Sequence, residues 1–103
     1  MTDKNLLDAI DHIAVTVKDI KESVAWYKAH FNCQVSYEDQ TWAYLEFANI
    51  RLAMVVAEQH PSHIGFQVKN AAKYGALTSH RDGTRSVYIK DPAGNILEMV
   101  DKA

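Results

Sequence analysis

Two histidines and a glutamate are the residues of this chain that best fit metal chemistry. Each histidine begins a six-residue phrase that the sequence states twice, His-Ile-Ala-Val-Thr-Val at 12–17 and His-Ile-Gly-Phe-Gln-Val at 63–68. Glu98 lies in a short apolar segment near the C-terminal end, where an unpaired buried carboxylate would be costly. Two neutral imidazoles and one carboxylate suit Zn, Mn, Fe, Co or Ni and leave positions open for water or substrate. We therefore take His12, His63 and Glu98 as candidate ligands.

The repeated phrase predicts two β-strands. Side chains alternate between the faces of a strand, so each histidine shares a face with small or polar residues, away from the apolar residues at every second position. A third strand at 96–100 would direct Glu98 away from its apolar layer. The residues alone leave a second interpretation open, in which the histidines are half-exposed strand residues and Glu98 is an exposed residue paired with Lys90 or Arg51.

The repeat divides the chain into two modules, at about 11–57 and 62–101. They must share a core, because 103 residues are too few for two independent ones. In the first module, Asp19 followed by Glu22 predicts a helix start after the first strand. The second module is abbreviated, with a shorter helix from Asn70 to about Ser79. The apolar stripe of the first helix is Ile20, Val24, Tyr27 and Phe31, and the remaining strands are predicted at 34–37, 41–47, 51–56, 86–90 and 96–100.

Composition narrows the class of protein. The chain is 48% hydrophobic and 23% charged, as expected of one globular domain over residues 1–103. It contains no apolar run long enough to cross a bilayer, and its first residues do not resemble a signal peptide, so we expect a cytoplasmic protein. A formal net charge of -2 gives no electrostatic reason to expect binding to nucleic acid or to a membrane surface.

Three segments together resemble the vicinal oxygen chelate superfamily. They are 12–20 with the aromatic pair Trp26-Tyr27, the second phrase at 63–68, and Ser-Val-Tyr-Ile-Lys-Asp-Pro-Ala-Gly-Asn-Ile-Leu-Glu at 86–98. The superfamily includes glyoxalase I, extradiol dioxygenases, fosfomycin-resistance thiol transferases and bleomycin-binding proteins. The resemblance implies an α+β fold of paired βαβββ modules, a curled mixed sheet around a metal cavity, and a homodimer. It places His12, His63 and Glu98 on the superfamily's ligand positions for one divalent transition metal ion.

Ala53 occupies the fourth position of this pattern. When 52–55 is aligned with 97–100, Ala53 falls where glyoxalase I carries a glutamate that is both a ligand and the proton-transfer base. This counts against ordinary glyoxalase chemistry. Two histidines and one glutamate are the set of the fosfomycin-resistance transferases and the extradiol dioxygenases, and Tyr88 matches a substrate-contacting tyrosine of the former. However, Ala14 replaces that group's hydroxyl residue two places after its first histidine.

Three functions are compatible with these residues. The leading hypothesis is a small metal-dependent enzyme, a lyase, isomerase or thiol transferase whose ion acts as a Lewis acid on a substrate chelating through adjacent oxygens. Tyr88 would orient the substrate or donate a hydrogen bond. The alternatives are a non-catalytic small-molecule binding protein of the bleomycin-resistance kind, using aromatic residues such as Trp42, and an Fe(II) extradiol-type dioxygenase. The other predicted substrate contacts are Arg51, Ser86 and Lys90, with Trp42 as an aromatic surface.

Overall fold

A computed structural model describes residues 7–80 and 82–101 of the chain. Within it the chain forms two compact units. One unit is His12–His63, and the other contains the described residues of 64–101 together with residues 7–11. Among the described residues, the strands of the first unit follow the order β2 (Gln34–Glu38), β3 (Trp42–Glu46), β4 (Arg51–Val56) and β1 (Ala9–Val17). Those of the other unit follow the order β5 (His63–Val68), β8 (Ile96–Asp101), β7 (Arg85–Lys90) and β6 (Thr78–Ser79). The predicted α+β class and mixed sheet are confirmed.

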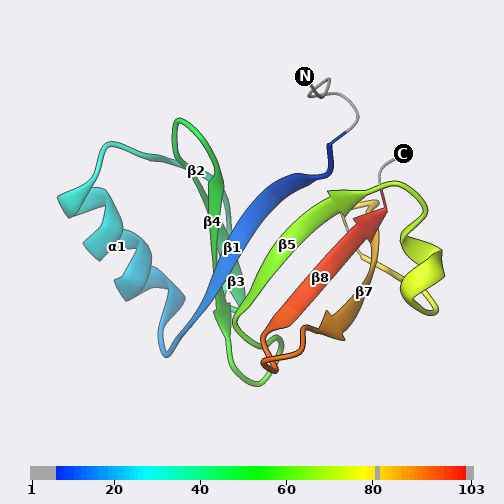
Figure 1. The fold of residues 1–103 in the computed structure, drawn as a ribbon. Coiled ribbons are helices and arrows are strands. Elements are labelled where there is room, and N and C mark those ends of the chain that lie inside the picture. Colours follow the sequence, from blue (N-terminus) through cyan, green and yellow to red (C-terminus); the bar gives the residue numbers. More distant parts are fainter. Residues whose placement is uncertain (1–6, 81, 102–103) are drawn as a thin grey trace. The chain divides into compact units, whose positions relative to one another are not determined.

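In the first unit, β1 and β4 are parallel neighbours, and β3 pairs antiparallel with both β4 and β2. Strand β1 begins three residues before the repeated phrase. Figure 1 shows the helix along one side of these strands. The predicted order of strand, helix and three strands is confirmed. The elements are β1 (Ala9–Val17), α1 (Ile20–His30), β2 (Gln34–Glu38), β3 (Trp42–Glu46) and β4 (Arg51–Val56).

The helix packs against one face of the strands of this unit. Asp19 is the N-cap, and its side chain accepts a hydrogen bond from the backbone N–H of Glu22 at 2.9 Å, as the sequence predicts. Ile20 and Val24 are buried against residues of β3 and β4. The prediction for Phe31 is wrong, because it lies just beyond the last turn and is 48% exposed. The helix thus packs on the face opposite His12.

In the other unit, β5 is parallel to β8, and β7 is antiparallel to both β8 and β6. The predicted helix from Asn70 to Ser79 is wrong. A four-residue 3-10 turn, η2, stands in its place, and Gly75 ends it with a φ of 148°. The turn contacts β7 and β8, and Figure 1 shows it in yellow on the β7 side of the unit. The elements are β5 (His63–Val68), η2 (Ala71–Tyr74), β6 (Thr78–Ser79), β7 (Arg85–Lys90) and β8 (Ile96–Asp101).

The core of this unit lies on the face opposite Glu98. Val68, Ala71 and Met99 are its buried members, and Leu97 packs against them, so the apolar layer predicted for β8 is confirmed. Among the residues described in the structure, no helix is both long enough and apolar enough to span a membrane.

Asp39 organises the turn that connects β2 to β3. Its Oδ1 accepts hydrogen bonds from the backbone N–H of Thr41 at 2.8 Å and of Trp42 at 3.0 Å, and its Oδ2 accepts one from the Tyr37 hydroxyl. Partial burial raises the pKa of Asp39, but these hydrogen bonds together outweigh it and hold the pKa well below its ordinary value of 3.8.

We expect Asp39→Asn to destabilise the protein by about 1 kcal/mol at neutral pH, since hydrogen bonds to a charged acceptor are the stronger ones. A carboxyl with a lowered folded-state pKa stabilises the fold above its unfolded-state pKa, and that contribution disappears as the pH falls through the folded value. Urea unfolding of both proteins at pH 7 and at about pH 2 checks this. An equal difference between the two proteins at both pH values would contradict it.

Candidate metal centre

The two units use the same strand register around their histidine strands. In the first unit Ala14 pairs with Ala53, and in the other Gly65 pairs with Glu98. Ala14 follows His12 by two residues and Gly65 follows His63 by two, so Ala53 and Glu98 are equivalent positions. This is the alignment that the sequence predicts. One unit therefore has alanine where the other has a carboxylate.

His12 and His63 form a buried pair. They are 3% and 8% exposed, and their Nε2 atoms lie 3.2 Å apart. The Nδ1 atom of His63 lies 2.7 Å from the carbonyl oxygen of Pro61, which can only accept a hydrogen bond. Nδ1 must therefore carry a proton, so the lone pair of the neutral imidazole is on Nε2. A backbone carbonyl that fixes the tautomer in this way is common at metal-binding histidines.

Glu98 is 8% exposed and belongs to a hydrogen-bonded cluster of its own unit. Its Oε2 accepts a hydrogen bond from the hydroxyl of Ser86 at 2.7 Å. The Nε2 of His80 lies 2.6 Å from the same hydroxyl oxygen and 3.6 Å from Oε2 of Glu98. The alternative pairing of Glu98 with Lys90 or Arg51 as an exposed residue does not fit this burial.

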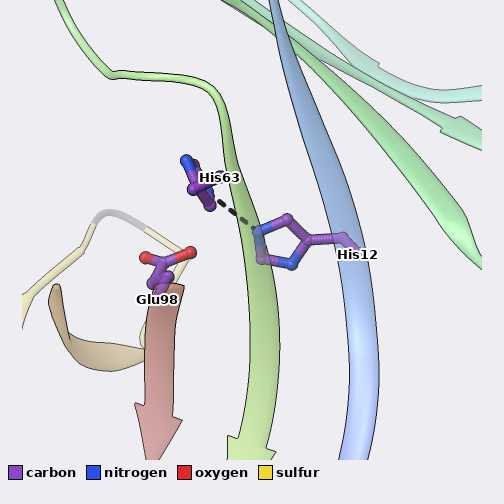
Figure 2. A group of neighbouring side chains, drawn as sticks. All are labelled: His12, His63 and Glu98. Atoms are coloured by element: carbon purple, nitrogen blue, oxygen red, sulfur yellow. Dashed lines mark hydrogen bonds between the residues drawn. The ribbon is translucent and has the colours of Figure 1, made fainter. Parts of the chain in front are cut away.

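One ligand atom from each of the three predicted residues, His12, His63 and Glu98, lies within 4.8 Å of the other two. Figure 2 shows the two imidazoles and the carboxylate directed toward one another. Two imidazole nitrogens and one carboxylate oxygen are a donor set for Zn, Mn, Fe, Co or Ni. The residues present thus fit a divalent transition metal ion, and the three could hold one.

The first unit carries a series of aromatic rings on the face that bears His12. The Tyr44 ring is 5.7 Å from that of His12 and 4.8 Å from Trp42, and Trp42 stacks on Tyr37 at 4.1 Å. Arg51 lies over the Tyr44 ring at 4.5 Å and pairs in register with His12. Of the predicted substrate contacts, Trp42 and Arg51 are therefore on one face of one unit.

Three predicted residues lie on β7, on the face of Glu98. Tyr88 pairs directly with Glu98 and is 37% exposed, and Lys90 is exposed two residues further along. Ser86, also predicted as a substrate contact, is only 2% exposed and hydrogen-bonds Glu98. Burial thus separates Ser86 from Tyr88 and Lys90.

Sequence reasoning did not predict the positions of two residues, Tyr37 and His80. Tyr37 is directly opposite Tyr44 in the β2–β3 pair, so alternation counted back through the Asp39 turn could have placed it. The contact of His80 with Ser86 depends on a turn whose geometry the sequence does not fix. Glu46, on β3, accepts a hydrogen bond from Ser36 at 2.7 Å.

A family model described as the Glyoxalase/Bleomycin resistance protein/Dioxygenase superfamily matches residues 9–80. The chain belongs to this superfamily. The matched segment contains both histidines and ends before Glu98. No curated protein sequence matches the chain significantly.

Solved structures of the same fold come from several organisms. A hypothetical protein from Bacillus halodurans C-125 has a TM-score of 0.75 at 14% identity, over 93% of this chain and 95% of its own. Methylmalonyl-CoA epimerase from Mycobacterium tuberculosis has a TM-score of 0.71 at 18% identity, over 91% and 87%. A 2,3-dioxygenase from Pseudomonas sp. KL28 has a TM-score of 0.62 at 15% identity, over 91% and 42%. At these identities the likeness concerns the fold.

Proposed function

We propose that the protein is a small divalent-metal-dependent enzyme that acts on a substrate chelating through two adjacent oxygens. The supporting observation is the buried group of His12, His63 and Glu98, with ligand atoms within 4.8 Å of one another. When bound, the ion would act as a Lewis acid toward a developing enolate or alkoxide. The chemistry would be that of a lyase, an isomerase or a thiol transferase.

The side chains around the three ligands have distinct tasks in this proposal. Tyr88, opposite Glu98, orients the substrate or donates a hydrogen bond to it. Arg51, over the Tyr44 ring, and exposed Lys90 attract an anionic group of the substrate. Trp42 offers an apolar surface for its carbon skeleton. For buried Ser86 we propose a different task, described below. We further propose that the protein works in the cytoplasm, and that it forms a homodimer, as the family resemblance suggests.

Ala53 separates this proposal from glyoxalase chemistry. Its position is equivalent to that of Glu98, and alanine can neither bind a metal nor accept a proton. A reaction in this protein must therefore use another base, or must need none. The lack of a carboxylate at position 53 favours a reaction in which the nucleophile is part of a substrate, or in which the proton to be removed is already acidic.

The elemental content of protein purified without an affinity tag or added metal tests the proposal. We expect about one transition metal ion per chain, as for a site with three protein ligands, and its loss in Glu98→Ala. Absence of metal from the wild type, with no uptake on reconstitution, would refute it. Iron together with oxygen consumption would instead indicate an extradiol-type dioxygenase.

The aromatic series Tyr37, Trp42 and Tyr44 favours a second candidate function, non-catalytic binding of a planar small molecule. Stacked and edge-on rings bind planar ligands without any need for a metal. In this case fluorescence of the two tryptophans, Trp26 and Trp42, should respond to a planar ligand in metal-free protein, and Trp42→Leu should abolish the response while Trp26→Leu retains it.

A further inference from the structure

The hydrogen bonds around Ser86 run in one direction. A hydroxyl has one proton, and that of Ser86 is donated to Oε2 of Glu98 at 2.7 Å. The Nε2 of His80, 2.6 Å from the same hydroxyl oxygen, must therefore donate to it. The donors are thus ordered from His80 to Ser86 to Glu98. Neutral and protonated imidazole can both donate from Nε2, so the order holds for either form.

Both Ser86 and His80 lie close to the same oxygen of the Glu98 carboxylate, Oε2. Ser86 is 2% exposed, and its hydroxyl is directed at Oε2, while His80 lies 3.6 Å from that same atom. A buried hydroxyl needs a partner in any protein, so its hydrogen bond alone would indicate only a satisfied core residue. A second observation is needed to connect Ser86 with the task of Glu98.

The register of the two units supplies this observation. In the β7–β8 ladder, Ser86 and its partner Val100 lie two residues from the Tyr88–Glu98 pair. In the β3–β4 ladder, Trp42 and its partner Val55 lie two residues from the Tyr44–Ala53 pair. Trp42 is therefore the counterpart of Ser86, just as Ala53 is the counterpart of Glu98. The tyrosine is present in both units. The serine hydroxyl, however, is present only in the unit that has the carboxylate of Glu98, since its counterpart in the other unit is Trp42.

We propose that Ser86 and His80 are positioning residues that hold Oε2 of Glu98 and so fix the orientation of the carboxylate, which then binds a metal ion through one oxygen. This inference rests on the proposed metal-binding role of Glu98. A carboxylate free to turn could bind through both oxygens and occupy a coordination position that a chelating substrate needs. The serine and histidine thus keep that position open.

The test compares variants that remove or retain the donors. Ser86→Ala removes the hydroxyl, His80→Leu removes the N–H, and His80→Gln retains an N–H near the position of Nε2. Chelator-treated proteins are titrated with Co(II), recording the dissociation constant and the visible absorption spectrum, together with the melting temperature of each metal-free protein. Glu98→Ala and wild type are the reference proteins.

We expect Ser86→Ala and His80→Leu to bind Co(II) about 10- to 100-fold more weakly than wild type, because binding must then order a carboxylate that is no longer held. Their spectra should also change, because a carboxylate that binds through both oxygens raises the coordination number of the ion. The Co(II) affinity and spectrum of His80→Gln should stay close to those of wild type. The two His80 variants should have similar melting temperatures without metal, so the difference in their metal binding comes from the lost N–H and not from folding. Wild-type affinity and spectrum in both weakened variants, while Glu98→Ala fails to bind, would overturn the positioning role and leave the metal site standing. Failure of wild type to bind Co(II) would overturn the metal site and this role together.

Discussion

His63→Ala should abolish the stabilisation of the protein by divalent metal. The wild type should gain about 2.7 kcal/mol of unfolding free energy at a free metal concentration of 100 times its Kd, because only the folded state assembles the ligands. His63 is one of two buried imidazoles whose Nε2 atoms lie 3.2 Å apart, and its Nδ1 is held by Pro61. Its loss should weaken binding by more than the roughly 10- to 100-fold expected for a supporting residue.

The measurement is the melting temperature of each variant with and without metal, so any effect of the substitution on folding alone cancels. His60→Ala is the matched control, because His60 lies three residues away in the segment between β4 and β5 and is not a predicted ligand. His12→Ala should behave as His63→Ala does. A metal-induced shift of the same size in His63→Ala and His60→Ala would show that His63 is not a ligand.

Ala53→Glu should make the stability of the protein depend on metal. Ala53 is buried at the position equivalent to Glu98, so a glutamate there would place an unpaired charge in the interior. The metal-free variant should lose on the order of 3–5 kcal/mol. A divalent ion would compensate that charge, and the variant should recover most of the loss and bind metal more tightly than wild type.

Ala53→Gln is the control for this experiment, since it has nearly the same size and no charge. Urea unfolding of both variants with and without metal separates steric from electrostatic effects. If metal stabilises the glutamine and glutamate variants equally, position 53 does not face the ion, and the equivalence of the two units does not extend to coordination.

The strands, except the two-residue β6, could be predicted from the sequence because they depend on local patterns. The choice of His12, His63 and Glu98 as candidate ligands also needed the resemblance to a known superfamily. The phrase that begins at His12 and at His63 fixes two strands and the face that each histidine occupies. The register of Ala53 with Ala14 and of Glu98 with Gly65 follows from the same repeat. These features needed only alternation of side chains and the comparison of one half of the chain with the other.

The errors arise where packing between distant residues decides the structure. The segment from Asn70 to Ser79 contains good helix formers, but Gly75 interrupts it in a conformation that favours glycine, and a Cβ there would lie 3.2 Å from Cγ2 of Val87. Phe31 continues a helical stripe in the sequence, yet the helix ends before it. The task of Ser86 depends on the direction of one hydroxyl, which no sequence pattern records.

The alanine at position 53 also determines how much charge the proposed site would retain. A divalent ion beside two neutral imidazoles and a single carboxylate keeps one net positive charge, whereas a second carboxylate would neutralise it. Arg51, in register with His12, adds another cation to the same face. With a metal bound, such a site would prefer ligands that arrive as anions, such as an ionised hydroxy acid or a phosphonate, over neutral ketones or diols. Small inorganic anions should then compete with the substrate, and increasing ionic strength should weaken its binding.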